Sequence, residues 1–120
     1  AMPLEPRYKR PFATFVKKQH KPFQAVIEDQ VLDVCANPAT GEAKAGDLEG
    51  IWVHKFSYKK QMYLMAYHIP DAHDATNKAE DDDSELESAQ FLFMDFYQIG
   101  SHENFYDDLK AYLRADGWYK

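Results

Sequence analysis

The sequence has little cysteine and no long apolar run. Cys35 is the only cysteine among 120 residues, which excludes a disulfide framework and a zinc site built from several thiolates. No apolar stretch approaches the roughly 18 residues that a membrane span requires, and the N-terminus lacks the apolar core of a signal peptide. We therefore expect a cytoplasmic protein that does not contact membranes, with Cys35 in its core.

Several signatures of enzymes are also missing. The sequence contains no Walker loop, no dinucleotide fingerprint and no nucleophile elbow, so it does not belong to the enzyme classes built on them. His68, Asp71, His73 and Asp74 are metal-ligating residue types, but they straddle a predicted strand end and a loop. We therefore expect no metal and no other cofactor.

Charge is unevenly distributed along the chain. The formal net charge is -6 at pH 7, which by itself argues against binding to nucleic acid. However, eight of the 20 acidic residues lie between residues 71 and 87, whereas residues 1–21 carry six bases and one acid. The rest of the chain is therefore nearly neutral with a basic N-terminal end. Residues 70–88 are predicted to form an exposed, mobile acidic insertion.

Hydrophobic periodicity predicts the secondary structure of one domain spanning residues 1–120. Helices are predicted over residues 22–35, ended by Asn37-Pro38, and over residues 103–114. Strands are predicted over four segments, 12–16, 51–57, 61–69 and 91–99. This order favours an α+β fold, with a small, mostly antiparallel sheet, an N-terminal helical segment packed on it and a C-terminal helix, the helices lying against one side.

The stretch GSHENFYDDLKAYL, residues 100–113, contains the first candidate for chemistry. Ser101 is well placed to cap the last predicted helix. His102 and Tyr106 are four residues apart and would project together near the N-terminus of that helix, where a phosphate is favoured and where imidazole could act as a general base. A strand-to-helix junction with no chemistry accounts for the same residues, and both readings stay open.

Three lysines form a second candidate group. Lys55 lies on a predicted strand, and Lys59 and Lys60 lie at the turn that follows it. Lysines near a phosphate can hold a nucleic-acid backbone or stabilise the charge that develops during its cleavage. Solvated lysines are also common at hairpin tips, so these three residues can equally be surface charges without a function.

Three pieces of the sequence together resemble the RelE/ParE superfamily of bacterial type II toxins, and its ParE-like branch in particular. They are GDLEG followed by the strand with Lys55, the strand YLMAY and the closing GSHENFY, within residues 12–114. The resemblance implies a toxin that a cognate antitoxin protein neutralises. In RelE-like members the toxin cuts messenger RNA in the ribosomal A site without metal, by attack of a ribose 2′-hydroxyl.

Carried over to this sequence, the resemblance implies a role for each candidate residue. His102 would act as general base or acid, Lys55 would stabilise the transition-state phosphate, and Tyr106 would position the substrate or donate a proton. Lys59 and Lys60 would bind the RNA backbone. The leading hypothesis is therefore a ribosome-dependent endoribonuclease.

Two departures from the resemblance keep other functions open. Leu64 stands where RelE-like nucleases have an arginine that contacts the scissile phosphate, and the chain is acidic where such nucleases are basic. The alternatives are a non-catalytic toxin that inhibits a target such as DNA gyrase by binding, and an inactive member that retains antitoxin binding.

Overall fold

The centre of the fold is a mixed β-sheet. The computed structural model describes residues 4–70, 76–77 and 90–118. Five strands follow the order β1-β6-β4-β3-β2, and a two-residue strand, β5 (Thr76–Asn77), pairs with one end of β6. The bounds of the five are Leu4–Tyr8 for β1, Glu42–Ala43 for β2, Trp52–Tyr58 for β3, Gln61–His68 for β4 and Gln90–Ser101 for β6. Among the described strands β1 and β6 pair in parallel, and the other pairs are antiparallel.

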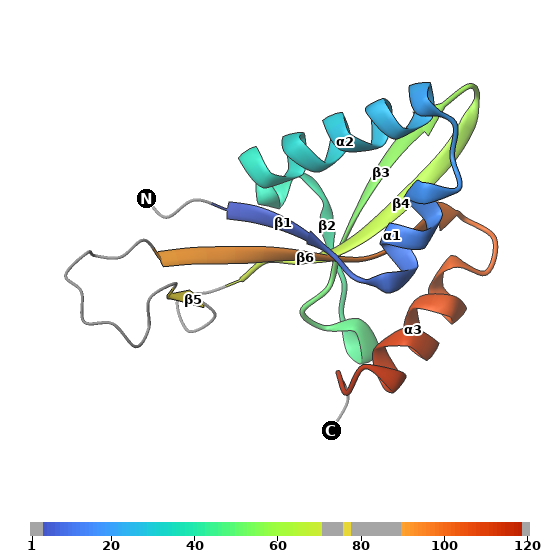
Figure 1. The fold of residues 1–120 in the computed structure, drawn as a ribbon. Coiled ribbons are helices and arrows are strands. Elements are labelled where there is room, and N and C mark those ends of the chain that lie inside the picture. The colour runs from blue at the N-terminus through green and yellow to red at the C-terminus, as the bar shows by residue number, and fades with distance from the viewer. Residues whose placement is uncertain (1–3, 71–75, 78–89, 119–120) are drawn as a thin grey trace.

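Three α-helices complete the α+β fold that the sequence predicts. They are α1 (Arg10–Lys17), α2 (Lys21–Ala36) and the C-terminal helix α3 (Phe105–Ala115). Two short 3₁₀ turns, η1 (Pro38–Thr40) and η2 (Gly46–Leu48), flank β2 in the segment between α2 and β3. Figure 1 shows α2 and α3 on opposite sides of the strands. The predicted acidic insertion falls largely outside the residues that the structure describes.

The strand predicted over residues 12–16 is wrong, because these residues belong to α1. Pro11 lies in the first turn of this helix, where its missing N–H is no loss. Phe12 is fully buried, and Phe15 and Val16 pack beside it, a spacing that a helix brings to one face. The first strand is β1, whose sequence LEPRY shows little alternation. Its Pro6 is tolerated because β1 is an edge strand.

Apolar side chains are buried on both faces of the sheet. On one face Met65 and Tyr67 of β4 join residues of α1 and α2 in a first core. On the other face Leu64 and Ala66 join residues of α3 in a second core, which we call the α3-side core. The prediction that the helices lie against one side is therefore wrong. The continuous apolar run of YLMAY is typical of a strand covered on both faces.

Strand β6 is longer than predicted and contains an irregularity. Gly100 and Ser101 do not end the strand, because they pair with β4. The register between the two strands shifts so that Tyr97 has no opposite residue, since its neighbours Phe96 and Gln98 pair with consecutive residues of β4. Such a bulge bends the strand and redirects side chains. The side chain of Tyr97 enters the α3-side core.

Candidate functional site

His102 and Tyr106 meet at the junction between β6 and α3. The centres of their rings lie 6.1 Å apart with the planes at 77°. Because α3 begins at Phe105, His102 precedes the helix and does not share a helical face with Tyr106. The sequence thus predicts the proximity of these two residues correctly but the helical geometry wrongly.

A tight turn, rather than a capped helix, brings His102 to the start of α3. Ser101 is paired in the sheet, and the N-cap position belongs to Asn104, which has φ of +61° and makes no capping hydrogen bond with its side chain. Asparagine tolerates this left-handed conformation better than most residues. The N–H of Phe105 donates to the carbonyl oxygen of His102 at 3.2 Å and closes the turn.

Lys44, a residue that the sequence does not single out, adjoins this pair. Its Nζ lies 5.4 Å from the centre of the Tyr106 ring and 3.3 Å from Oε1 of Glu42. Partial burial disfavours the charge, but the interactions with Glu42 and Tyr106 outweigh it and raise the pKa of Lys44. The structure therefore holds a charged ammonium group next to the tyrosine.

The short strand β2 explains the position of Lys44. Glu42 pairs with Val53 of β3, and the N–H of Lys44 donates to the carbonyl oxygen of Ile51 at 2.9 Å. Alternate residues of a strand point to the same face, and Val53 belongs to the α3-side core, so Glu42 and Lys44 face α3. A strand of two residues has no periodicity, which is why the sequence gives no signal for Lys44.

A buried tyrosine fixes the start of β2. The hydroxyl of Tyr67, a fully buried residue, donates to the carbonyl oxygen of Pro38 at 2.5 Å and accepts from the N–H of Gly41 at 3.1 Å. A Cβ atom on Gly41 would lie 2.6 Å from this hydroxyl oxygen and 2.8 Å from the carbonyl oxygen of Val53. The position of Lys44 thus depends on the Tyr67 hydroxyl and on glycine at position 41.

The three predicted lysines lie on the β3–β4 hairpin. Lys55 is exposed on β3, on the same face as Val53, and lines a shallow pocket of about 300 Å³ with Glu42. Among the described residues no hydrogen bond, ion pair or ring contact joins Lys55 to His102 or Tyr106. Lys59 and Lys60 form the exposed hairpin turn, both with positive φ. The three lysines therefore make no direct contact with the His102–Tyr106 pair in the described part of the chain, and their roles stay a prediction.

Acidic and apolar groups also shape the site. His102 and Tyr106 line a shallow pocket of about 250 Å³ together with Glu103, Asn104 and Asp107. The two carboxylates oppose the binding of a phosphate there, and Lys44 offsets them only in part. Leu64 is fully buried in the α3-side core, so its position offers no group to a substrate.

Neither a metal site nor a membrane span is found in the part of the chain that the structure describes. No cluster of three His, Cys, Asp or Glu side chains suited to a metal ion occurs there. Of the four metal-ligating residue types noted in the sequence, only His68 lies within this part, and the other three fall outside it. No helix within the described ranges combines the length and apolar character needed to cross a membrane.

The fold and the site define a class of protein: a small α+β protein with an exposed histidine beside a half-buried tyrosine and lysine at one end of its sheet. A family model described as the ParE-like toxin of type II bacterial toxin-antitoxin systems matches residues 7–78, more than half of the chain. The chain belongs to this family, and the resemblance seen in the sequence is confirmed. Membership supports a toxin role and implies an antitoxin protein as partner.

The family match covers only part of the candidate site. It includes Lys44 and Lys55 and ends before His102 and Tyr106. No significant match was found among curated proteins or among solved structures. The roles of His102 and Tyr106 therefore have to be argued from their own geometry.

Proposed function

We propose that this toxin is a metal-independent, ribosome-dependent endoribonuclease of the cytoplasm, with His102 and Tyr106 as its acid–base pair. The observation that supports this proposal best is the ring contact between the two residues, with the ammonium of Lys44 beside it. Cleavage of a phosphodiester by an internal hydroxyl needs a general base, a general acid and a group that stabilises negative charge, and an imidazole, a phenol and an ammonium can fill these three roles.

In the proposed reaction the ribose 2′-oxygen attacks the adjacent phosphorus while its proton passes to the imidazole of His102. Lys44 stabilises the negative charge that develops on the phosphorane. Tyr106 donates its proton to the leaving 5′-oxygen, which yields a 2′,3′-cyclic phosphate and a 5′-hydroxyl end. Proton exchange with solvent restores both residues. Lys55, Lys59 and Lys60 bind the RNA backbone along the exposed hairpin.

A toxin that inhibits by binding a target such as DNA gyrase is the second candidate. Two observations favour it. The carboxylates of Glu103 and Asp107 lie in the pocket of the candidate base, and the buried Leu64 offers no cation to a phosphate. In this case His102 and Tyr106 form only a strand-to-helix junction. An inactive member that binds antitoxin needs no site at all.

Induction of the wild-type chain without antitoxin distinguishes the three candidates. The nuclease proposal predicts growth arrest together with cleavage of transcripts inside their translated regions. The downstream fragments should carry 5′-hydroxyl ends. Growth arrest with intact transcripts would contradict the proposal and favour inhibition by binding. Unimpaired growth, with the protein shown to be folded and expressed, would favour the inactive member.

Lys44 is expected to matter more for cleavage than Lys55. Lys44→Ala should lower the cleavage rate by about 10–100-fold because the charge nearest the Tyr106 ring is lost. Lys55→Ala removes only a solvent-exposed contact with the RNA backbone and should lower the cleavage rate by about threefold. The rates are measured on a ribosome-bound transcript. Lys44→Arg, which keeps the charge, is the control, and a larger loss in Lys55→Ala would contradict the assignment.

A further inference from the structure

A third pocket lies beyond the other end of α3, on the face of the sheet that α3 covers. Its volume is about 240 Å³. Residues of β1, β4 and β6 and one residue after α3 line it: Arg7, His68, Phe93, Asp95, Tyr97 and Trp118. None of them takes part in the proposed cleavage, so the pocket requires an explanation of its own.

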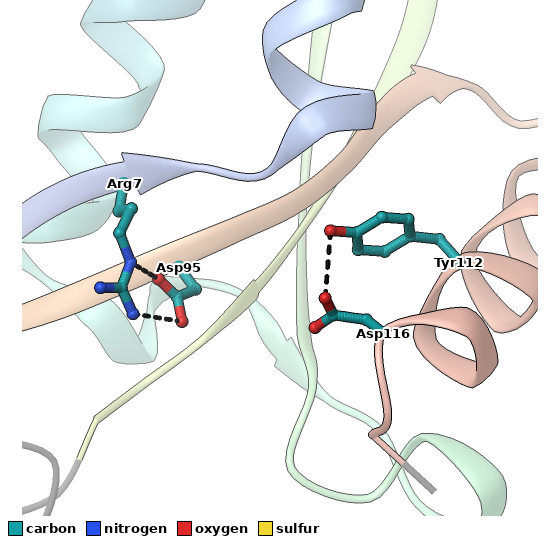
Figure 2. Close-up of polar contacts among 4 residues, drawn as sticks. All are labelled: Arg7, Asp95, Tyr112 and Asp116. Atoms are coloured by element: carbon teal, nitrogen blue, oxygen red, sulfur yellow. Dashed lines mark hydrogen bonds and ion pairs between the residues drawn. The ribbon is translucent and has the colours of Figure 1, made fainter.

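The charges in this pocket are already paired. Nε and Nη2 of Arg7 donate to the two carboxylate oxygens of Asp95 at 2.6 and 3.1 Å (Figure 2). The guanidinium carbon of Arg7 also lies 4.5 Å from the centre of the Phe93 ring. Because this bidentate pair compensates its own charge, the pocket does not call for a charged ligand.

Tyr97 brings a buried hydroxyl group without a partner to this pocket. The residue is 4% exposed, and within the described residues its hydroxyl makes no hydrogen bond. Burial raises the pKa of Tyr97 most, and the negative charge of the nearby Asp95 raises it further. The hydroxyl therefore keeps its proton and remains a donor. In contrast, the hydroxyl of the neighbouring Tyr112 donates to Asp116 at 3.4 Å (Figure 2). A buried donor without an acceptor reduces stability, so its presence in a pocket points to a ligand.

The walls of the pocket are aromatic. The ring of Trp118 lies 5.4 Å from that of His68 and 5.7 Å from that of Tyr97, edge to face in both cases. Gly117, with φ of +85°, ends the helical segment and allows the N–H of Trp118 to donate to the carbonyl oxygen of Leu113 at 2.9 Å. This turn holds the indole against the sheet. Aromatic faces of this kind bind planar rings by stacking.

We propose that this pocket binds a single nucleobase, stacked on its aromatic walls, with the hydroxyl of Tyr97 donating to an acceptor on the base. A nucleobase is neutral, planar and rich in hydrogen-bond acceptors, which matches the paired charges, the aromatic walls and the unpartnered donor. The volume lies just below the roughly 300–1,000 Å³ of pockets for larger ligands, so it suits one ring system. The ammonium of Lys9, 5.7 Å from the Tyr97 ring centre, adds a positive charge for the attached phosphate. This site stands independently of the proposed cleavage.

The test uses the fluorescence of Trp118. Trp52→Phe leaves Trp118 as the only tryptophan, because the chain contains two. In this background AMP, GMP, CMP and UMP are titrated against ribose 5-phosphate, and short oligoribonucleotides are titrated in parallel. At least one nucleotide or oligonucleotide should change the Trp118 emission, whereas ribose 5-phosphate should leave it unchanged. Binding of mononucleotides identifies a free nucleotide as the source, and binding of oligonucleotides alone identifies RNA.

Two conservative variants separate binding from folding. Tyr97→Phe should weaken nucleotide binding by about tenfold, the effect of one hydrogen bond, while its melting temperature stays equal or rises. Tyr112→Phe, the matched control, should bind as the parent does. The proposal is wrong if neither nucleotides nor oligonucleotides change the emission, if ribose 5-phosphate binds equally well, or if Tyr97→Phe binds with unchanged affinity.

Discussion

Replacing His102 with alanine is expected to abolish transcript cleavage and growth inhibition. General acid–base catalysis contributes about 10²–10⁴-fold to a rate, and no other imidazole in the described structure makes a ring contact with Tyr106. His102 is exposed, so its removal should change the free energy of unfolding by less than about 0.5 kcal/mol. Growth curves, transcript mapping and a thermal melt of the purified variant provide the three measurements.

A second histidine provides a matched control for this prediction. His20 is also exposed and meets a tyrosine edge to face, with its ring centre 6.3 Å from that of Tyr58. It lies at the start of α2, away from the β6–α3 junction. His20→Ala should therefore cleave as the wild type does. If His102→Ala instead arrests growth as strongly as the wild type, catalysis by His102 is refuted and the target is inhibited by binding.

Replacing Gly41 with alanine is expected to lower the free energy of unfolding by about 2–4 kcal/mol. The new methyl group would lie 2.6 Å from the Tyr67 hydroxyl and 2.8 Å from the Val53 carbonyl oxygen. Neither atom can move easily. The Tyr67 hydroxyl donates a hydrogen bond to the carbonyl oxygen of Pro38, and Val53 lies on β3, which is paired on both sides. Overpacking and the loss of a buried hydrogen bond each contribute about 1–3 kcal/mol. Urea unfolding of the purified protein measures the difference.

Gly100→Ala is the control for this second prediction. A Cβ at Gly100 meets nothing within 4 Å, and its φ is not in the left-handed region. The substitution should change stability by less than about 0.5 kcal/mol. Equal stability of both variants would show that β2 relaxes away from Tyr67, which would also undermine the fixed position assigned to Lys44.

The sequence predicts the elements whose apolar pattern is local. The helix that became α2, the β3–β4 hairpin and the helix that became α3 follow from periodicity within each segment, and the structure contains all three. The sequence does not predict β1, because LEPRY has almost no apolar alternation and the partner strand of β1, β6, lies far along the chain. The sequence signals that both faces of the sheet are covered only in YLMAY, where every residue is apolar.

The candidate site shows the same division. The proximity of His102 and Tyr106 follows from their separation by four residues, which a tight turn preserves as well as a helix does. Lys44 lies 62 residues from Tyr106 in the sequence, and only the pairing of β2 with β3 brings it there. Such contacts depend on tertiary register, which no local pattern encodes.

The parallel pairing of β1 with β6 has a consequence for how the molecule acquires its shape. Leu4 pairs with Leu92, and the Arg7–Asp95 ion pair spans 88 residues of sequence. Contacts between such distant residues form slowly, because a long loop must close before they contribute. During synthesis β1 has no partner until β6 has left the ribosome. The sheet therefore closes only after the chain up to β6 has been translated, and β1 joins it last.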